Sequence, residues 1–213
     1  YREWFVRLRF PGHEHTCITD GVPEGWERNS LGDIAHINQT SLGSAFDGEI
    51  EYIDIASVTP GSINETTSYD FRDAPSRARR VVSHGDIIWS CVRPNRRSYA
   101  VIWRPPENLV ASTGFAVITP ISLPTSFLYQ AVTTDLFVGY LGEPCQRRSL
   151  SRSVATTSDG RRCCAIARFC LNAFNGFAEP MLSEAHNLRG QNQKLRAARD
   201  LLLPRFMSGA IVV

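Results

Sequence analysis

The stretch from Gly142 to Cys170, GEPCQRRSLSRSVATTSDGRRCCAIARFC, gathers thiols and guanidinium groups that could do chemistry. It holds four of the six cysteines and six arginines. Cysteine thiolates are the preferred ligands of structural zinc, and a basic, polar segment can bind phosphate groups. However, seventeen residues separate Cys145 from the adjacent pair Cys163-Cys164, and five more precede Cys170. Adjacent cysteines rarely chelate one tetrahedral ion, so we expect no metal in this segment.

A second candidate for metal binding is the sequence His13-Glu14-His15 in a polar linker. Two ligands do not close a metal site, and we interpret this triplet as a solvated linker. The chain also lacks a Gly-rich cofactor loop, a P-loop, a nuclease-type carboxylate pair followed by lysine, and an amino-methyltransferase motif. The sequence therefore offers no candidate for a catalytic residue or a cofactor site.

Two basic clusters outside the cysteine-rich stretch have the residue types that contact nucleic acid. Ser76–Arg80 reads SRARR, and Arg93–Tyr99 reads RPNRRSY between two strand-like runs. Arginine binds phosphates and pairs bidentately with guanine, and asparagine pairs with adenine in the same way. The sequence NQTSLGS at 38–44 adds small polar side chains. The predicted contact residues are Arg77, Arg79, Arg80, Arg93, Asn95, Arg96, Arg97 and Tyr99.

The charge balance gives weak support for an anionic partner. Net charge is +2, but residues 142–170 contribute six arginines against Glu143 and Asp159, a net of +4, which leaves −2 for the remaining chain. Exposed loops are often basic without binding anything, so the two clusters could also be solvated surface. Binding by this chain alone should be weak and should fall with salt.

Short strands and a few helices must position these residues. Strand-like runs lie at Ile50–Val58, Asp86–Val92, Tyr99–Trp103 and Leu109–Thr119, and the loop 93–99 should be a hairpin connection. The run 123–141 predicts one helix with Pro124 in its first turn and an apolar face of Phe127, Leu128, Val132, Leu136 and Tyr140. The N-terminal YREWFVRLRF predicts another helix, with Trp4, Phe5 and Leu8 on one face.

The C-terminal region has a heptad pattern from Met181 to Pro204. Leu188, Leu195 and Leu202 are seven residues apart, and Asn192 falls at a core position, where a buried asparagine commonly fixes the register of a coiled coil. The alternative is an amphipathic helix packed on its own domain. A helix of about 30 residues is about 45 Å long, longer than a small domain is wide, which favours pairing with another helix.

Length and composition suit one globular domain with an appended helix. The chain has 213 residues, of which 43% are hydrophobic and 21% charged. We expect a cytoplasmic protein with free thiols, since the sequence has neither a membrane-length apolar run nor a signal peptide. The start without methionine, inside a predicted helix, suggests a fragment of a longer protein.

Several motifs, in order along the chain, resemble the DNA-specificity (S) subunits of type I restriction–modification enzymes. They are YREWFVRLRFPGHE, GVPEGWE followed by LGDIA, GDIIWSCVRPNRRSYAVI, ASTGFAVITP and LRGQNQKLRAARDLLLPRFMSG. The resemblance covers nearly the whole chain except 143–170 and corresponds to the second half of such a subunit. It implies the end of a spacer helix and a linker at 1–21, a target-recognition domain at 22–170 and a helical spacer at 171–213.

The resemblance implies a fold and a set of partners. The fold is an α/β (α+β) recognition domain with a mixed, mainly β core, followed by a long coiled-coil-type helix. The partners are double-stranded DNA, methyltransferase (M) subunits, the endonuclease (R) subunit through the complex, and the other spacer or a second copy, with no membrane. The implied function is non-catalytic recognition of one DNA half-site. The alternative is a coiled-coil adaptor that binds the M subunit but not DNA.

The cysteine-rich stretch fits this resemblance poorly, and two interpretations of it remain open. It could be a disordered basic arm. It could also be a frameshifted segment, because suitable codons for 145–154 and 156–171 give text similar to the family in the two other reading frames. In the second case, 143–170 should be loosely packed and the recognition domain should lose its last strands.

Overall fold

The computed structural model of the chain describes residues 1–142, 163–165 and 168–208. Most of the cysteine-rich stretch therefore lies outside the described residues. The strands are β1 (Ile18–Thr19), β2 (Val22–Pro23), β3 (Glu27–Asn29), β4 (Ala35–Ile37), β5 (Glu49–Ile53), β6 (Val58–Thr59), β7 (Ser62–Ile63), β8 (Thr67–Asp70), β9 (Ala78–Val81), β10 (Ile87–Ser90), β11 (Tyr99–Val101), β12 (Leu109–Ser112), β13 (Phe115–Pro120) and β14 (Cys163–Ala165). The α-helices are α1 (Leu31–Ile34), α2 (Thr125–Val132), α3 (Asp135–Gly142) and α5 (Arg168–Met207).

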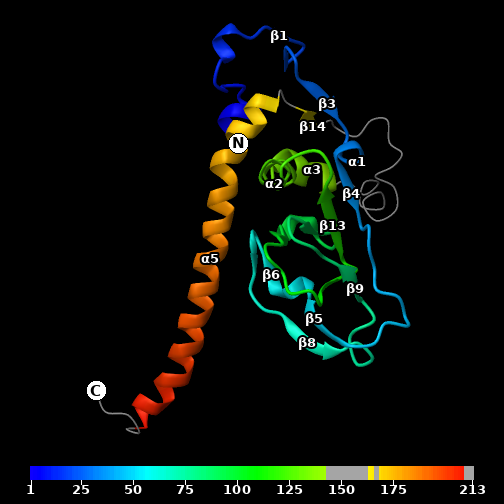
Figure 1. Ribbon diagram of the computed structural model, residues 1–213, viewed down its shortest axis with the longest axis vertical. Coiled ribbons are helices and arrows are strands. Elements are labelled where there is room, and N and C mark those ends of the chain that lie inside the picture. The colour runs from blue at the N-terminus through cyan, green and yellow to red at the C-terminus, as the bar shows by residue number, and fades with distance from the viewer. Residues whose placement is uncertain (143–162, 166–167, 209–213) are drawn as a thin grey trace. The chain divides into compact units, whose positions relative to one another are not determined.

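Two four-stranded sheets form the centre of the N-terminal unit (Figure 1). The first has the order β11-β10-β13-β4 and is antiparallel throughout. The second has the order β8-β5-β12-β9, and β12 runs parallel to β5 but antiparallel to β9. The sheets are mixed and mainly antiparallel, and a long helix ends the chain, so the predicted fold class is confirmed.

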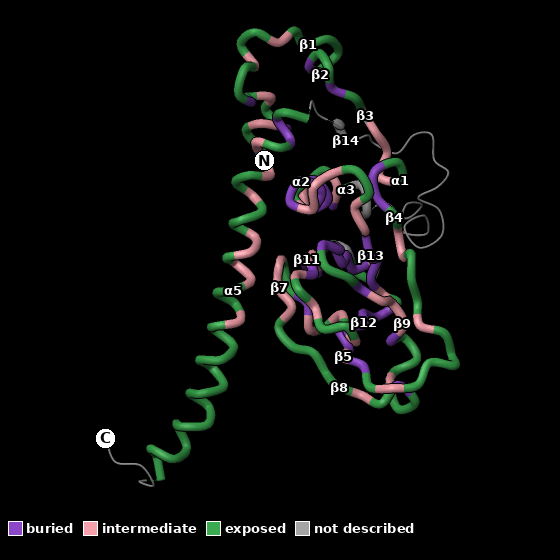
Figure 2. Tube along the Cα trace, in the orientation of Figure 1, coloured by how far each residue is buried: buried purple, intermediate pink, exposed green. Residues whose placement is uncertain are grey.

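The core lies in layers on both faces of the first sheet (Figure 2). Ile88 and Val117 point toward the second sheet, where they pack with Ile53 and Ala111. Strand neighbours such as Ile87 point the other way and pack against α2 and α3. This alternation is what a strand buried on both faces requires, and it explains why β10 and β13 read as continuous apolar runs.

The predicted strand Leu109–Thr119 is two strands in different sheets. β12 ends at Ser112 and β13 begins at Phe115, with a turn at Thr113-Gly114 between them. The Ile55 side chain packs closely against this turn, since a Cβ on Gly114 would lie 2.3 Å from Ile55 Cδ1. The prediction of one run was wrong because a short apolar stretch shows no change of period where the chain crosses between sheets.

The predicted single helix at 123–141 is also interrupted. α2 ends at Val132 and α3 begins at Asp135. The Thr133 and Thr134 hydroxyls donate to the backbone carbonyls of Tyr129 and Ala131, each at 2.9 Å, which offers this segment an alternative to helical bonding. Phe127, Leu128 and Val132 are buried as predicted, but Leu136 is 67% exposed because the break changes its direction.

The N-terminal helix is shorter than predicted. It is a single π-helical segment at Arg2–Val6, and Leu8 lies beyond it with a left-handed φ of 57°. Phe5 is buried, and its ring centroid lies 5.0 Å from that of Phe127 in α2 and 5.1 Å from that of Phe174 in α5. Aromatic packing therefore holds the N-terminal segment and the first turns of α5 to the sheet domain.

The chain divides into two compact units, Tyr1–Asn175 and Gly176–Val213. The second unit contains most of α5, which has 40 residues and so a length of about 60 Å. The helix continues past Pro180 and Pro204 to Met207, three residues beyond the predicted end of the pattern. Among the described helices, none is long and apolar enough to cross a membrane.

The described ends of the cysteine-rich stretch carry regular structure. β14 pairs with β3 in antiparallel register, and α5 already begins at Arg168. Cys170 is buried (5% exposed) and Phe169 beside it is 74% exposed, so loose packing of 143–170 stays a prediction. The zinc, basic-arm and frameshift interpretations of 143–162 fall on residues outside the described part of the chain.

Candidate nucleic-acid interface

The two predicted basic clusters lie on either side of the turn between β12 and β13. The Thr113 backbone N–H donates to the carbonyl of Arg77 at 2.8 Å, at the start of β9. The Cys91 N–H donates to the carbonyl of Gly114 at 2.9 Å, at the end of β10. One two-residue turn therefore bonds to Arg77 of SRARR and to Cys91, two residues before RPNRRSY begins, although a whole strand separates the clusters in sequence.

The third predicted segment, at 38–44, runs beside β9. The Leu42 N–H donates to the Arg79 carbonyl at 2.8 Å, and the Val81 N–H donates to the Thr40 carbonyl at 3.2 Å. A side-chain contact joins the same two segments, because Arg80 Nη1 donates to Ser41 Oγ at 3.1 Å. The structure thus brings small polar side chains of the NQTSLGS loop next to the arginines of β9.

Arg79 and Arg80 are partly buried cations. The Arg79 guanidinium carbon lies 4.4 Å from the centroid of the Phe71 ring, and its Nε donates to the Ser76 carbonyl at 3.3 Å. Arg79 Nη1 and Arg80 Nε are buried without a hydrogen-bond partner among the described residues. Neither side chain forms an ion pair within the described part of the chain. Partial desolvation without a counter-ion makes an anionic ligand favourable here.

The β10–β11 loop presents most of its predicted contact residues to solvent. The antiparallel pairing of β10 with β11 confirms the predicted hairpin connection, and Pro94–Arg96 forms a 3-10 turn within it. Arg93, Asn95 and Arg96 are exposed. Arg77, in the other cluster, is exposed as well, just before β9 begins.

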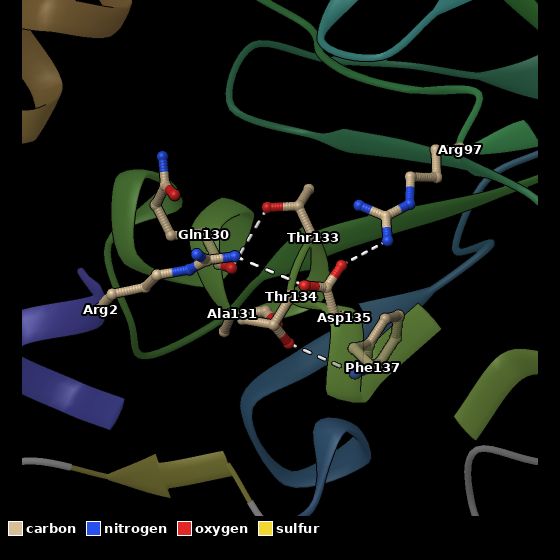
Figure 3. A network of polar contacts seen from close by, with 8 residues as sticks. All are labelled: Arg2, Arg97, Gln130, Ala131, Thr133, Thr134, Asp135 and Phe137. Carbon is tan, nitrogen blue, oxygen red and sulfur yellow. Dashed lines mark hydrogen bonds and ion pairs between the residues drawn. The ribbon is translucent and has the colours of Figure 1, made fainter. Parts of the chain in front are cut away.

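Arg97 forms an ion pair within the protein. Its Nη2 donates to Asp135 Oδ1 at the first residue of α3, and Arg2 Nη2 approaches the other carboxylate oxygen at 3.5 Å (Figure 3). The hydrogen bond from Arg97, together with its charge, lowers the pKa of Asp135 below its usual value. Thr134 caps the start of α3, because its Oγ1 accepts a hydrogen bond from the Phe137 N–H at 3.3 Å. Asp135 is the first residue of that helix.

Tyr99 belongs to an aromatic cluster beneath the loop. Its ring centroid lies 5.5 Å from that of Trp89 and 6.0 Å from that of Tyr129. Trp89 is fully buried, and its indole N–H donates to the Val132 carbonyl at 2.9 Å. The cluster ties the base of the loop to α2 and α3.

Sequence reasoning missed Asp135 and Trp89. An acidic residue directly after Thr133-Thr134 is a signal for a helix start, and it could have placed Asp135 at an N-terminus. No local signal could have paired it with Arg97, which is 38 residues away.

The predicted helix-pairing residues lie on one stripe of α5 and are open to solvent. Leu188, Leu195 and Leu202 are 49%, 67% and 41% exposed, and Asn192 is exposed too.

The triplet His13-Glu14-His15, interpreted from the sequence as a solvated linker, contacts its own segment. His13 Nδ1 lies 2.8 Å from the Phe10 carbonyl oxygen. No group of three or more potential metal ligands occurs in the described parts of the chain.

Comparisons with known proteins found one sequence relative and eight similar solved chains, two of which represent the structural match. The Type I restriction enzyme HindI specificity subunit of Haemophilus influenzae is 28% identical over 131 residues, which cover 58% of this chain and 28% of that protein. No family model matches the chain.

Two solved chains share its fold. The first comes from a study of the structural basis of complex assembly and conformational transition of the type I R-M system, with a TM-score of 0.56, 22% identity, and coverage of 89% of this chain and 50% of that one. The second is the HsdS subunit from Thermoanaerobacter tengcongensis, with a TM-score of 0.53, 20% identity, and coverage of 84% and 45%. The chain spans about half the length of these solved chains.

These likenesses agree with the motifs of the sequence and with the mixed sheets followed by a long helix. The chain is thus similar in sequence, over 58% of its length, to a type I restriction enzyme specificity subunit, and it shares its fold with solved chains of type I R-M proteins.

Proposed function

We propose that this chain recognises double-stranded DNA, as the half of a specificity subunit that reads one half-site. Its surface for DNA comprises three segments: Thr40–Ser41, Arg77–Arg80 and Arg93–Tyr99. The observation that carries the proposal is the Thr113-Gly114 turn, whose two hydrogen bonds, at 2.8 and 2.9 Å, hold Arg77 of the first basic cluster and Cys91, two residues before the second, to the same turn. Clustered arginines are the electrostatic footprint of a DNA-binding surface.

The environments of the arginines suggest different roles. Arg79 and Arg80 are anchored in or beside β9 and lack an acidic partner among the described residues, so they suit phosphate contacts, which fix position without reading sequence. Arg93, Asn95 and Arg96 are exposed on a short turn, and they suit contacts with base edges in the major groove. Arg97 and Tyr99 lie at the base of this loop.

The chain has no catalytic role in this proposal. It directs M subunits, and through them the R subunit, to the DNA target. We place the end of a spacer helix and a linker at 1–21, the recognition domain at 22–170 and a helical spacer at 171–213. The stripe formed by Leu188, Asn192, Leu195 and Leu202 then pairs with another helix, either the second spacer of a longer subunit or a second copy. Leucines spaced by seven residues on an exposed face support such pairing.

Fluorescence anisotropy with labelled duplex DNA of random sequence, at increasing salt, tests the DNA surface. The full chain is used alone and with the M subunit. The double variant Arg79→Ala/Arg80→Ala should bind about a hundredfold more weakly, because each charge-assisted hydrogen bond to phosphate contributes about tenfold. Its plot of log affinity against log salt should be shallower by about 0.9 for each phosphate that the variant no longer neutralises.

Arg104→Ala is the matched control for this measurement. Arg104 is also an exposed arginine, and it lies with Val81, Val82 and Pro105 at the C-terminal end of β9, outside the three segments proposed for DNA. Its removal should leave the salt dependence unchanged. Equal loss of affinity in both variants would show that binding follows net charge alone. Retained binding to the M subunit with no DNA binding would support the adaptor function instead.

A triple variant of Leu188, Leu195 and Leu202 to Gln tests the helix pairing. It should reduce self-association or pairing with a spacer peptide, measured by analytical ultracentrifugation. Leu201→Gln is the control, because that residue is equally exposed (68%) but off the heptad positions. Unchanged association in the triple variant would rule out the stripe as the pairing surface.

A further inference from the structure

The β10–β11 loop has an unusual backbone conformation at both ends of its 3-10 turn. Arg93 and Arg97 each have a φ of 53°, although neither is glycine. A non-glycine residue in the left-handed region is strained, and such a residue persists where its surroundings over-determine it. The loop therefore needs contacts that hold it.

Two sets of contacts hold the loop. At its stem, the Ser90 N–H donates to the Ser98 carbonyl at 2.9 Å, and the Ser90 hydroxyl donates to the Val92 carbonyl at 2.9 Å. On its outer side, the 3-10 turn packs against α3, and Arg97 reaches Asp135 at the first residue of that helix. A carboxylate is favoured at a helix N-terminus, so the position of Asp135 at the start of α3 stabilises the charged form that pairs with Arg97.

We propose that Arg97 and Asp135 form a brace that sets the conformation of the recognition loop, so that Arg97 positions the loop and does not touch DNA. Arg93, Asn95 and Arg96 are then the residues that meet base edges. This inference rests on the proposed DNA-recognition function. Asp135 acts through Arg97 and is a positioning residue too.

The ion pair that Arg97 already forms supports this division of roles. Its side chain is 41% exposed and already carries a carboxylate partner, whereas Arg79 and Arg80 have none among the described residues. A base or phosphate that approached Arg97 would meet a guanidinium whose Nη2 is already bonded to a carboxylate and whose charge is already balanced by it. Exposed ion pairs contribute little to global stability. The effect of this one should therefore be confined to the order of the loop.

A charge swap separates a brace from a DNA contact. The variants are Arg97→Asp, Asp135→Arg and the two together, all made with Arg2→Gln so that the new arginine does not face Arg2. Hydrogen–deuterium exchange of the full chain is measured over residues 92–98. Each single change should make exchange there about two- to fivefold faster, the factor expected for one exposed ion pair, and the swap should restore it. The equivalent swap of Arg199 and Asp200, another exposed ion pair, is the control and should not affect the loop.

The second arm selects sequences from a random duplex DNA pool with each variant. Arg97→Asp alone should broaden the pattern of enriched bases. The swapped variant should recover both the pattern and an affinity within about twofold of that of the Arg2→Gln chain. Exchange that is unchanged in the single variants would overturn the brace. Restored protection combined with DNA binding as weak as that of Arg97→Asp would also overturn it, because Arg97 would then contact DNA itself.

The two proposals fail in different ways. If the unaltered chain enriches no sequence, with or without the M subunit, DNA recognition fails, and the exchange measurements alone decide whether the brace exists. If the chain enriches a sequence and the exchange is unaffected, recognition stands and the brace fails.

Discussion

The arginines of β9 and those of the β10–β11 loop look alike in the sequence but lie in different surroundings. Arg79 and Arg80 sit in a strand bonded on both edges, with partly buried guanidinium groups and no acidic partner in the described chain. Arg97 sits at the end of a short turn and is paired with Asp135. Similar charge density can thus serve an external anion in one place and internal structure in another.

The turn that joins the two regions should give the largest effect on stability. Gly114→Ala would bring a Cβ to 2.3 Å from Ile55 Cδ1 and 3.2 Å from its Cγ1, so we expect a loss of about 1–3 kcal/mol in the free energy of unfolding. Denaturant unfolding measures it. Ile55→Val removes Cδ1 and should rescue part of the loss in the double variant. Gly43→Ala, where nothing lies within 4 Å, is the control. If Gly114→Ala is no worse than Gly43→Ala, the turn is not a tight joint.

Trp89, at the base of the β10–β11 loop, should give the next largest effect on stability. Trp89→Phe removes the indole N–H that donates to the Val132 carbonyl at 2.9 Å and leaves that buried acceptor unpaired, at a cost of about 1–3 kcal/mol. Trp103→Phe is a matched control, since Trp103 Nε1 is buried without a partner among the described residues and its loss removes an unsatisfied donor. Thermal unfolding should therefore show a clearly larger decrease for Trp89→Phe. Equal decreases would mean that ring volume, and not the hydrogen bond, matters at both sites.

Single neutralised arginines sharpen the comparison directly. Arg80→Gln should reduce the slope of log affinity for random duplex DNA against log salt by about 0.9, because one phosphate is no longer neutralised and its counter-ion is no longer released on binding. Arg97→Gln should leave the slope unchanged, since Asp135 already neutralises this arginine in the free protein. Anisotropy titrations at several salt concentrations measure both slopes. A reduction in the Arg97 variant equal to that of Arg80 would place Arg97 on the DNA.

Asp86 should give the smallest effect on stability, and as a buried acidic group it contrasts with the arginines of β9. It is a buried carboxyl that accepts from Thr119 Oγ1 at 2.7 Å and from the Ser83 N–H at 2.7 Å, and burial raises its pKa above the usual 3.8. The guanidinium groups of β9 stay charged and need an anion, whereas Asp86 can take up a proton.

The raised pKa has a defined consequence for stability. Stability contributed by protonated Asp86 is fully present below the unfolded pKa and is lost as pH rises through the higher folded pKa. Asp86→Asn cannot ionise, so the variant should gain stability relative to the unaltered chain as pH rises across this window. Urea unfolding from acid to neutral pH measures the difference. A difference independent of pH would show that Asp86 titrates normally.

Local patterns predicted much of the fold. The β10–β11 hairpin, the buried faces of Phe127, Leu128 and Val132, and the long C-terminal helix follow from apolar spacing within a short window. The breaks at Thr113-Gly114 and Thr133-Thr134 were missed. The first break occurs where the chain crosses from one sheet to the other, and the second where two hydroxyls bond to the helix backbone. Apolar periodicity shows neither feature.

The candidate interface was predicted by residue type and assembled only by packing. Composition indicated SRARR and RPNRRSY as basic segments, because a run of arginines is visible wherever it occurs. Their meeting at one turn depends on β12 pairing with β5 and β9 in one sheet while β13 joins β10 in the other. Such pairings join residues tens of positions apart and are chosen by burial of whole sheet faces, which no short stretch encodes.

The arginines and their number are thus properties of the amino-acid sequence, as are the heptad leucines and the apolar strands. Which arginine has an acidic neighbour is a property of the fold. Arg97 meets Asp135 because α3 packs against the loop, while Arg79 meets the Phe71 ring because β9 and the segment after β8 cover the same core. Charge pairing depends on distances in space, and distances between remote residues exist only once the sheets have packed.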